Sequence, residues 1–120
     1  MATPQAPAYK GAAKFEMYLG PNSLIHWRFI GPNGKIVSVS KGTTIKETVY
    51  EAIRHIKENA NVEQRYERTT PADGKFGFRL RAANHQVVAE SLVFETAAER
   101  DEAMGFMKRA GEAVVVGGAI

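Results

Sequence analysis

The amino-acid sequence predicts an α+β protein built from two tandem copies of one β(3)-α-β unit. Similar residues recur along the 120-residue chain at a constant offset of 51 positions (79 − 28), without a gap. In each half, short segments of alternating apolar and polar residues, typical of strands, precede apolar residues at helical spacing. The recurring segments include Phe15-Glu16 and Tyr66-Glu67, Trp27-Arg28-Phe29 and Phe78-Arg79-Leu80, Ser40 and Ser91, and Glu51-Ala52-Ile53 and Glu102-Ala103-Met104.

A single domain is predicted for residues 14–116, with one repeat at 14–64 and the other at 65–116. A copy of roughly 50 residues is near the size at which a separate core becomes marginal. The two copies therefore gain most by burying their apolar faces against each other, which predicts pseudo-two-fold symmetry. Residues 1–13 contain prolines and alanines without periodicity and predict a flexible tail. Residues 117–120 are expected to form a second tail.

The first half predicts a three-stranded meander, with strands at residues 14–19, 25–29 and 35–40. Turn sequences separate these strands, and the second of them contains Asn33-Gly34, the strongest short hairpin signal. Because side chains alternate between the two faces of a strand, one face should pack into the core. The residues expected on that face are Phe15, Met17, Leu19, Ile25, Trp27 and Phe29.

The second half follows the same plan, with strands at residues 65–69, 75–81 and 86–91. Residues 114–116, three consecutive valines after the last helix, predict one more short strand. Residues 62–64 are their counterpart in the first copy and run directly into the second repeat.

Each meander is followed by a predicted helix that begins at a capping box. Thr44 with Glu47, and Thr96 with Glu99, have the spacing at which both side chains satisfy free backbone N–H groups. Because the two boxes are 52 residues apart (96 − 44), one helix should begin one residue out of step. The apolar stripes expected on the helices are Ile45, Val49, Ala52, Ile53 and Ile56, and Ala103, Met104 and Met107.

Composition excludes several classes of protein. The chain has no cysteine, which rules out disulfides, thiolate metal sites and cysteine nucleophiles. No segment approaches the roughly 20 apolar residues that a membrane helix needs. The Ala/Pro-rich start does not resemble a secretion signal, so we expect a cytoplasmic protein. The formal net charge of +3 permits a polyanionic partner but does not imply one.

Four cationic residues are the candidate binding residues: Arg28, Lys75, Arg79 and Arg81. Arg28 and Arg79 occupy equivalent outward positions, from which their guanidinium groups could bind phosphate or carboxylate bidentately. Lys75 and Arg81 either enlarge this basic patch or keep the open face of the sheet soluble.

Cross-strand ion pairs are the structural alternative for the two equivalent arginines. If Glu16 lies opposite Arg28, two core residues of the first strand, Phe15 and Met17, fall opposite two of the second, Phe29 and Trp27. Glu67 would pair with Arg79 in the same way.

Other residues that could carry chemistry lack the necessary context. Trp27 could offer a stacking surface, but its position on the apolar face favours the core. The three histidines, His26, His55 and His85, lack metal-ligand spacing and are expected to be solvated. No glycine-rich segment precedes a helix as a phosphate loop requires, and no nucleophile sits in a catalytic motif. We therefore expect no metal, no cofactor and no enzyme activity.

Several local strings resemble the YegP-like family of small, mostly bacterial proteins of unknown function. They are Gly74-Lys75-Phe76, Phe78 to Leu80, Ala82-Ala83-Asn84-His85-Gln86 with Val87-Val88, and Arg65-Tyr66-Glu67. The first repeat departs from the family pattern at Gly31-Pro32-Asn33-Gly34, and it lacks the aromatic residue that Phe94 supplies before the second helix. The resemblance covers about residues 14–115. It implies one antiparallel sheet with the last strands of the repeats exchanged and the helices on one face, and it implies no established activity.

These observations leave two hypotheses for function. The first is a non-catalytic interaction module that binds a protein or assembles with itself, because an open sheet face is expected without a catalytic constellation. The second is weak binding of nucleic acid or another anion along the four candidate cations.

Overall fold

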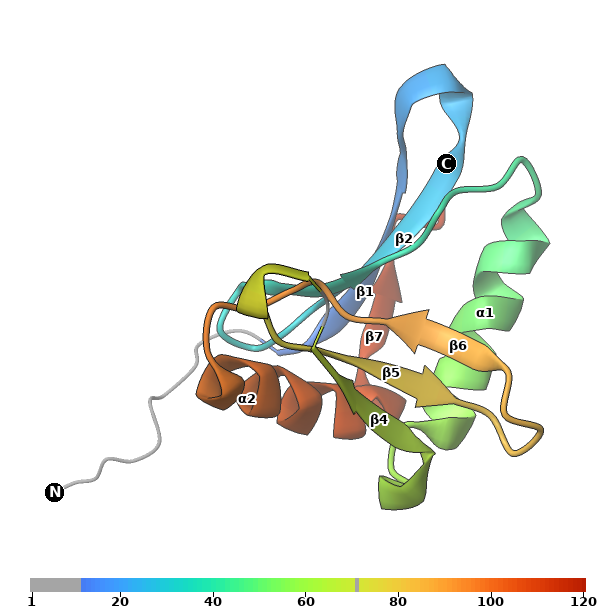
Figure 1. The fold of residues 1–120 in the computed structure, drawn as a ribbon. Helices are drawn as coiled ribbons and strands as arrows, with labels where there is room; N and C mark the ends of the chain where they lie inside the picture. The colour runs from blue at the N-terminus through green and yellow to red at the C-terminus, as the bar shows by residue number, and fades with distance from the viewer. Residues whose placement is uncertain (1–11, 71) are drawn as a thin grey trace, which may run out of the picture.

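The computed structural model, which describes residues 12–70 and 72–120, shows a mixed α+β fold with two β-sheets and two α-helices (Figure 1). One sheet has the strand order β3-β2-β1-β7 and the other has the order β4-β5-β6. The strands are β1 (Lys14–Leu19), β2 (Ile25–Ile30), β3 (Ile36–Val39), β4 (Tyr66–Thr69), β5 (Gly77–Arg81), β6 (Val87–Glu90) and β7 (Val114–Val116), and the helices are α1 (Lys46–Asn59) and α2 (Ala97–Lys108).

The prediction of a single antiparallel sheet is wrong in two respects. The two meanders form separate sheets that meet at one bridge, between Ser38 and Ser91, and β7 runs parallel to β1. Both meanders contain a register shift, after Phe29 in one and after Leu80 in the other. Irregularities of this kind increase strand twist. Besides the bridge, a hydrogen bond from Ser38 Oγ to the Glu90 carbonyl oxygen joins the two meanders.

The two segments expected to be exchanged between the repeats differ in structure. β7, which follows α2, pairs with β1 of the first half. Its counterpart at residues 62–64 does not form a strand, because a 3₁₀ turn covers Glu63–Arg65. The chain must enter β4 at Tyr66, directly after this segment, and the Tyr66 hydroxyl donates a hydrogen bond to the Ala60 carbonyl oxygen at 2.5 Å. Residues 60–66 are thereby folded back against the end of α1.

One hydrophobic core contains side chains from both sheets and both helices. The predicted register is confirmed, with Phe15 opposite Phe29 and Met17 opposite Trp27. Trp27 is only 5% exposed, so its interpretation as a core residue is also confirmed. The residues with the most deeply buried large side chains are Phe15, Phe29, Phe78, Ile56, Leu80, Met104 and Met107. Leu19 and Ile45, expected in the core, are exposed because each lies at the end of its apolar stripe.

The two helices begin in step, not one residue apart as the capping boxes predict. α2 has the predicted box, in which Thr96 Oγ1 accepts from the Glu99 amide and Glu99 accepts from the Thr96 amide. α1 begins at Lys46, which is the counterpart of Ala97 in the repeat, so the counterpart of Thr96 is Ile45, which has no hydroxyl group. The box expected at Thr44 is therefore not formed.

Residues 117–120, expected as a tail, lie against the body of the protein. The Lys46 ammonium group donates to the Ile120 carbonyl oxygen at 3.2 Å. Gly117 has φ of +88°, and a Cβ atom there would lie 2.2 Å from the Met17 carbonyl oxygen, so glycine is required at this position. Most of the tail expected at residues 1–13 lies outside the described residues.

Candidate partner-binding surface

The four candidate cations do not form one cluster. Arg28 lies on β2 in the first sheet, whereas Arg79 and Arg81 lie on β5 in the second. Lys75 precedes β5 and is paired with Glu95, in the loop before α2. The structure thus brings only Arg79 and Arg81 together.

On the first sheet, Arg28 forms the predicted ion pair. Glu16 lies opposite it in the register, and Oε1 of Glu16 accepts from Nε of Arg28 at 2.6 Å. The guanidinium carbon also lies 4.6 Å from the centre of the Tyr18 ring, which places the cation over the phenol. Arg28 is therefore engaged by both a carboxylate and a ring.

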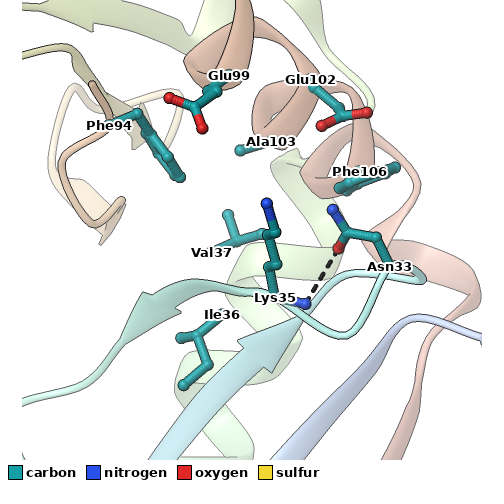
Figure 2. A pocket seen from close by; sticks show the side chains of 9 residues that line it. All are labelled: Asn33, Lys35, Ile36, Val37, Phe94, Glu99, Glu102, Ala103 and Phe106. Carbon is teal, nitrogen blue, oxygen red and sulfur yellow. Dashed lines mark hydrogen bonds between the residues drawn. The ribbon is translucent and has the colours of Figure 1, made fainter. Parts of the chain in front are cut away.

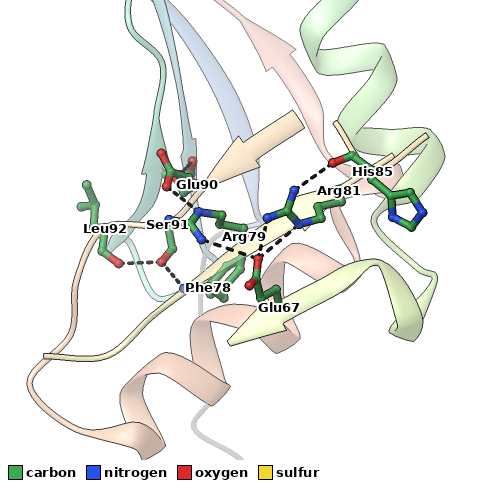
Figure 3. Close-up of polar contacts among 9 residues, drawn as sticks. Glu67, Phe78, Arg79, Arg81, His85, Glu90, Ser91 and Leu92 are labelled. Carbon is green, nitrogen blue, oxygen red and sulfur yellow. Dashed lines mark hydrogen bonds and ion pairs between the residues drawn. The ribbon is translucent and has the colours of Figure 1, made fainter. Parts of the chain in front are cut away.

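On the second sheet, two arginines and two glutamates form a network (Figure 3). Glu67 lies opposite Arg79 as predicted, with 3.6 Å between Nη1 and Oε1. Arg79 nevertheless lies closer to Glu90, to which its Nε donates at 2.9 Å, and Glu67 lies closer to Arg81, whose Nη2 donates at 2.8 Å. Sequence reasoning missed Glu90, because a register shift between Leu80 and Arg81 changes which residue of β6 lies opposite Arg79.

The network favours the charged forms of Glu67 and Arg79. Hydrogen bonding from Arg81, followed by its charge, lowers the pKa of Glu67, and Arg79 adds to this effect. The hydrogen bond to Glu90 is the largest cause of the raised pKa of Arg79. Because the folded-state pKa of Glu67 is depressed, its contribution to stability is present above the ordinary glutamate pKa and is lost as pH falls through the lowered value.

A hollow lies on the outer face of the second sheet, over Gly77. About 880 Å³ of empty space lies in and above it, a volume that includes open solvent. Gly77 lies buried at its base between two hydroxyl groups, because a Cβ atom there would lie 3.0 Å from Thr69 Oγ1 and 3.3 Å from Ser91 Oγ. The residues that line it are Glu67, Arg68, Thr69, Thr70, Gly77, Phe78, Arg79, Glu90, Ser91 and Val93. The hollow therefore joins the ion-pair network to three residues with hydroxyl groups and to an apolar wall.

A second pocket lies between the first meander and α2 (Figure 2). Its empty space of about 300 Å³ includes open solvent, and Lys35 points into it toward α2. At this contact, a Cβ atom on Gly31 would lie 2.7 Å from the Phe106 ring. The pocket therefore lies beside a closely packed contact between a turn and a helix, and none of the four candidate cations lines it.

The histidines are distributed as the sequence predicts, with one exception. His55 and His85 are exposed, but His26 is half-buried and stacks on the Tyr18 ring, which corrects the expectation of three solvated histidines. Across residues 12–70 and 72–120, no group of three or more His, Cys, Asp or Glu side chains could hold a metal ion. Within the same residues, neither helix is long and apolar enough to cross a lipid bilayer.

The fold is that of small α+β proteins with known structures. The solution structure of the YegP protein of Escherichia coli has a TM-score of 0.76 and 30% sequence identity, covering 88% of this chain and 91% of that one. A UPF0339 protein of Shewanella oneidensis has a TM-score of 0.77 at 24% identity, covering 87% and 89%. The second likeness shows the shared fold.

The sequence comparisons identify the family. Residues 72–116 match a domain of unknown function, DUF1508. The UPF0339 protein YegP of Escherichia coli O157:H7 is 31% identical over 105 residues, which cover 88% of this chain and 96% of the relative. The chain belongs to the UPF0339 (YegP) family, as its local strings suggest.

Proposed function

We propose that this protein is a non-catalytic protein-interaction module, which docks its partner on the outer face of β4, β5 and β6. The observation that carries the proposal is the pairing of every candidate cation with a carboxylate. The surface is therefore a fixed pattern of both charge signs. Such a pattern suits a protein surface with complementary charges, because charge complementarity selects the partner and orients it.

The hollow over Gly77 supports this proposal. Its walls come from three hydrogen-bonded strands, so a partner would meet a preformed surface. Val93, one of the lining residues, is 55% exposed, an apolar side chain next to charged ones. Interfaces combine apolar centres with polar rims in this way. The acidic and basic groups around the hollow hold one another in ion pairs, which supports a binding role over a catalytic one.

We also infer that the two halves are a tandem repeat related by pseudo-two-fold symmetry. Isolated bridges join Ile25 to Thr43 and Phe76 to Phe94, which are equivalent positions of the two repeats. The hydroxyl oxygens of Ser40 and Ser91 accept hydrogen bonds from backbone amides that are also at equivalent positions, each at 2.9 Å. This repetition provides matched control positions for experiments.

A photoreactive benzoylphenylalanine in place of Thr70, which lines the hollow, should cross-link the partner in living cells. The same residue in place of Leu19, the counterpart of Thr70 in the first sheet, should give little or no adduct. Mass spectrometry of the adduct identifies the partner, and twice the 13.2 kDa chain mass would indicate self-association. Equal adducts from both positions, or an adduct from Leu19 alone, would contradict the proposed surface.

Weak binding of nucleic acid or another anion along Arg28, Lys75, Arg79 and Arg81 is the alternative function. The same ion pairs argue against strong binding, since a phosphate would have to displace carboxylates such as Glu67 and Glu90 that also repel it. Exposed ion pairs each contribute only about 0–1 kcal/mol, so phosphate can displace some of these carboxylates. Weak binding is therefore still compatible with the ion pairs.

We expect any oligonucleotide binding to be weak and lost at physiological ionic strength. Contacts to several phosphates release counterions, so affinity measured by fluorescence should fall steeply between about 50 and 150 mM salt. Single- and double-stranded oligonucleotides should behave alike. Sub-micromolar binding that persists at the higher salt concentration and disappears in Arg79→Ala would make nucleic acid the leading partner.

A further inference from the structure

The outer face of the first sheet is covered by three planar groups. The imidazole of His26 stacks on the phenol ring of Tyr18, with ring centres 5.3 Å apart and ring planes inclined by 16°. The guanidinium carbon of Arg28 lies 4.6 Å from the centre of the Tyr18 ring. His26 also contacts the backbone, with 3.2 Å between its Nδ1 and the Ser40 carbonyl oxygen.

The second sheet keeps the arginine of this arrangement but has neither ring. The repeat counterparts of Arg28, Tyr18 and His26 are Arg79, Thr69 and Gly77. Arg79 still has a glutamate opposite it, as Arg28 does. The hollow over Gly77 therefore occupies the place that an aromatic pair fills in the first sheet.

The residue next to the aromatic pair in the first sheet also differs from its counterpart beside the hollow in the second sheet. A Cβ atom on Gly42 would lie 2.7 Å from the His26 ring, so the first sheet needs glycine there to accommodate its own imidazole. The counterpart of Gly42 is Val93, which lines the hollow and remains 55% exposed. In the second sheet an exposed apolar side chain thus stands beside a buried glycine that carries no ring.

We propose that the hollow over Gly77 binds one aromatic side chain, a phenol or an imidazole, of a partner protein. The ring would lie over Gly77 against Val93, and Arg79 would cover it as Arg28 covers Tyr18. This inference rests on the proposed function, because it names the chemistry by which that surface recognises its partner. Aromatic side chains are the usual anchors that fill pockets at protein interfaces.

The ion-pair network orients the guanidinium group of Arg79 before a ring binds. Glu90 and Glu67 hold its guanidinium group from two directions, at 2.9 and 3.6 Å. A planar guanidinium that is already oriented loses little freedom when it stacks on a ring. The two carboxylates repel an anion electrostatically, but they do not repel a neutral ring.

NMR titration of the isotopically labelled full chain tests the proposal with small probes. The probes are p-cresol for tyrosine, 4-methylimidazole for histidine, and 4-methylcyclohexanol as the saturated analogue of p-cresol. The two aromatic probes should shift the amide signals of Thr69, Gly77 and Ser91. The saturated analogue should bind about two- to fivefold more weakly than p-cresol, the factor expected for an exposed cation–π contact.

Matched variants assign the binding to Arg79. Arg79→Gln should weaken p-cresol binding by about two- to fivefold, whereas Arg28→Gln, its counterpart, should leave the affinity unchanged. Val93→Ser, at an exposed position that the core does not use, should also weaken binding if Arg79→Gln proves unstable. Absence of shifts at the hollow, equal binding of the saturated analogue, or an equal effect of Arg28→Gln would overturn the proposal.

The NMR titration and the cross-linking experiment can fail independently, so a failure of aromatic recognition is distinguishable from a failure of the proposed function. A specific Thr70 adduct without ring binding would overturn the aromatic recognition and support the interaction module. Ring binding without any Thr70 adduct would overturn the protein partner and support the hollow as an aromatic site.

Discussion

Replacing Trp27 with alanine should lower the free energy of unfolding by about 3–5 kcal/mol, the usual loss for a large buried aromatic side chain. Trp27 is 5% exposed and meets Phe15 edge-on, with ring centres 5.8 Å apart and planes inclined by 70°. Alanine would leave a cavity where the first sheet joins the core. Urea denaturation followed by far-UV circular dichroism measures the change, since the variant has no tryptophan left to report by fluorescence.

Two further variants control for this result. Leu19→Ala, on the neighbouring strand, removes an apolar side chain that is 57% exposed and should change stability little. Phe78→Ala removes the counterpart of Trp27 in the second sheet, which is 1% exposed, and should be as costly as Trp27→Ala. A loss below about 1 kcal/mol for Trp27→Ala, far under the range for buried aromatics, would show that Trp27 is a surface residue.

Residues 1–61 should not fold when expressed alone. This fragment lacks β7, the parallel neighbour of β1, and it lacks Phe78 and Leu80, which share the core with its own residues. α1 would then expose Ile53 and Ile56, which are almost fully buried in the whole chain. Without these contacts a helix and three short strands cannot offset the entropy of ordering the chain.

Urea titration of the purified fragment should show no cooperative transition. Addition of residues 62–120 should restore the circular dichroism spectrum of the intact protein, because the second fragment supplies β7 and the rest of the core. A fragment of residues 1–61 that unfolds cooperatively as a monomer would contradict this account.

The ionic part of the candidate surface followed from the sequence only in part. The ion pair of Glu16 with Arg28 was predictable, because the apolar alternation of two adjacent strands fixes which residues lie opposite each other. Glu90 was not assigned to Arg79, since β5 and β6 have a register shift between Leu80 and Arg81 that periodicity does not reveal. The hollow required the structure, because it depends on which side chains surround Gly77 in space.

The sequence by itself determined most of the local elements and the residues that make up most of the core. Periodicity and turn residues act within a few neighbours, so they suffice for strands, helices and the capping box at Thr96. Only the tertiary structure decided that the two meanders twist into separate sheets and that β7 pairs with β1. It also decided that one outer face carries its own aromatic stack while the other remains open. Those features depend on contacts between distant segments, whose geometry no local pattern encodes.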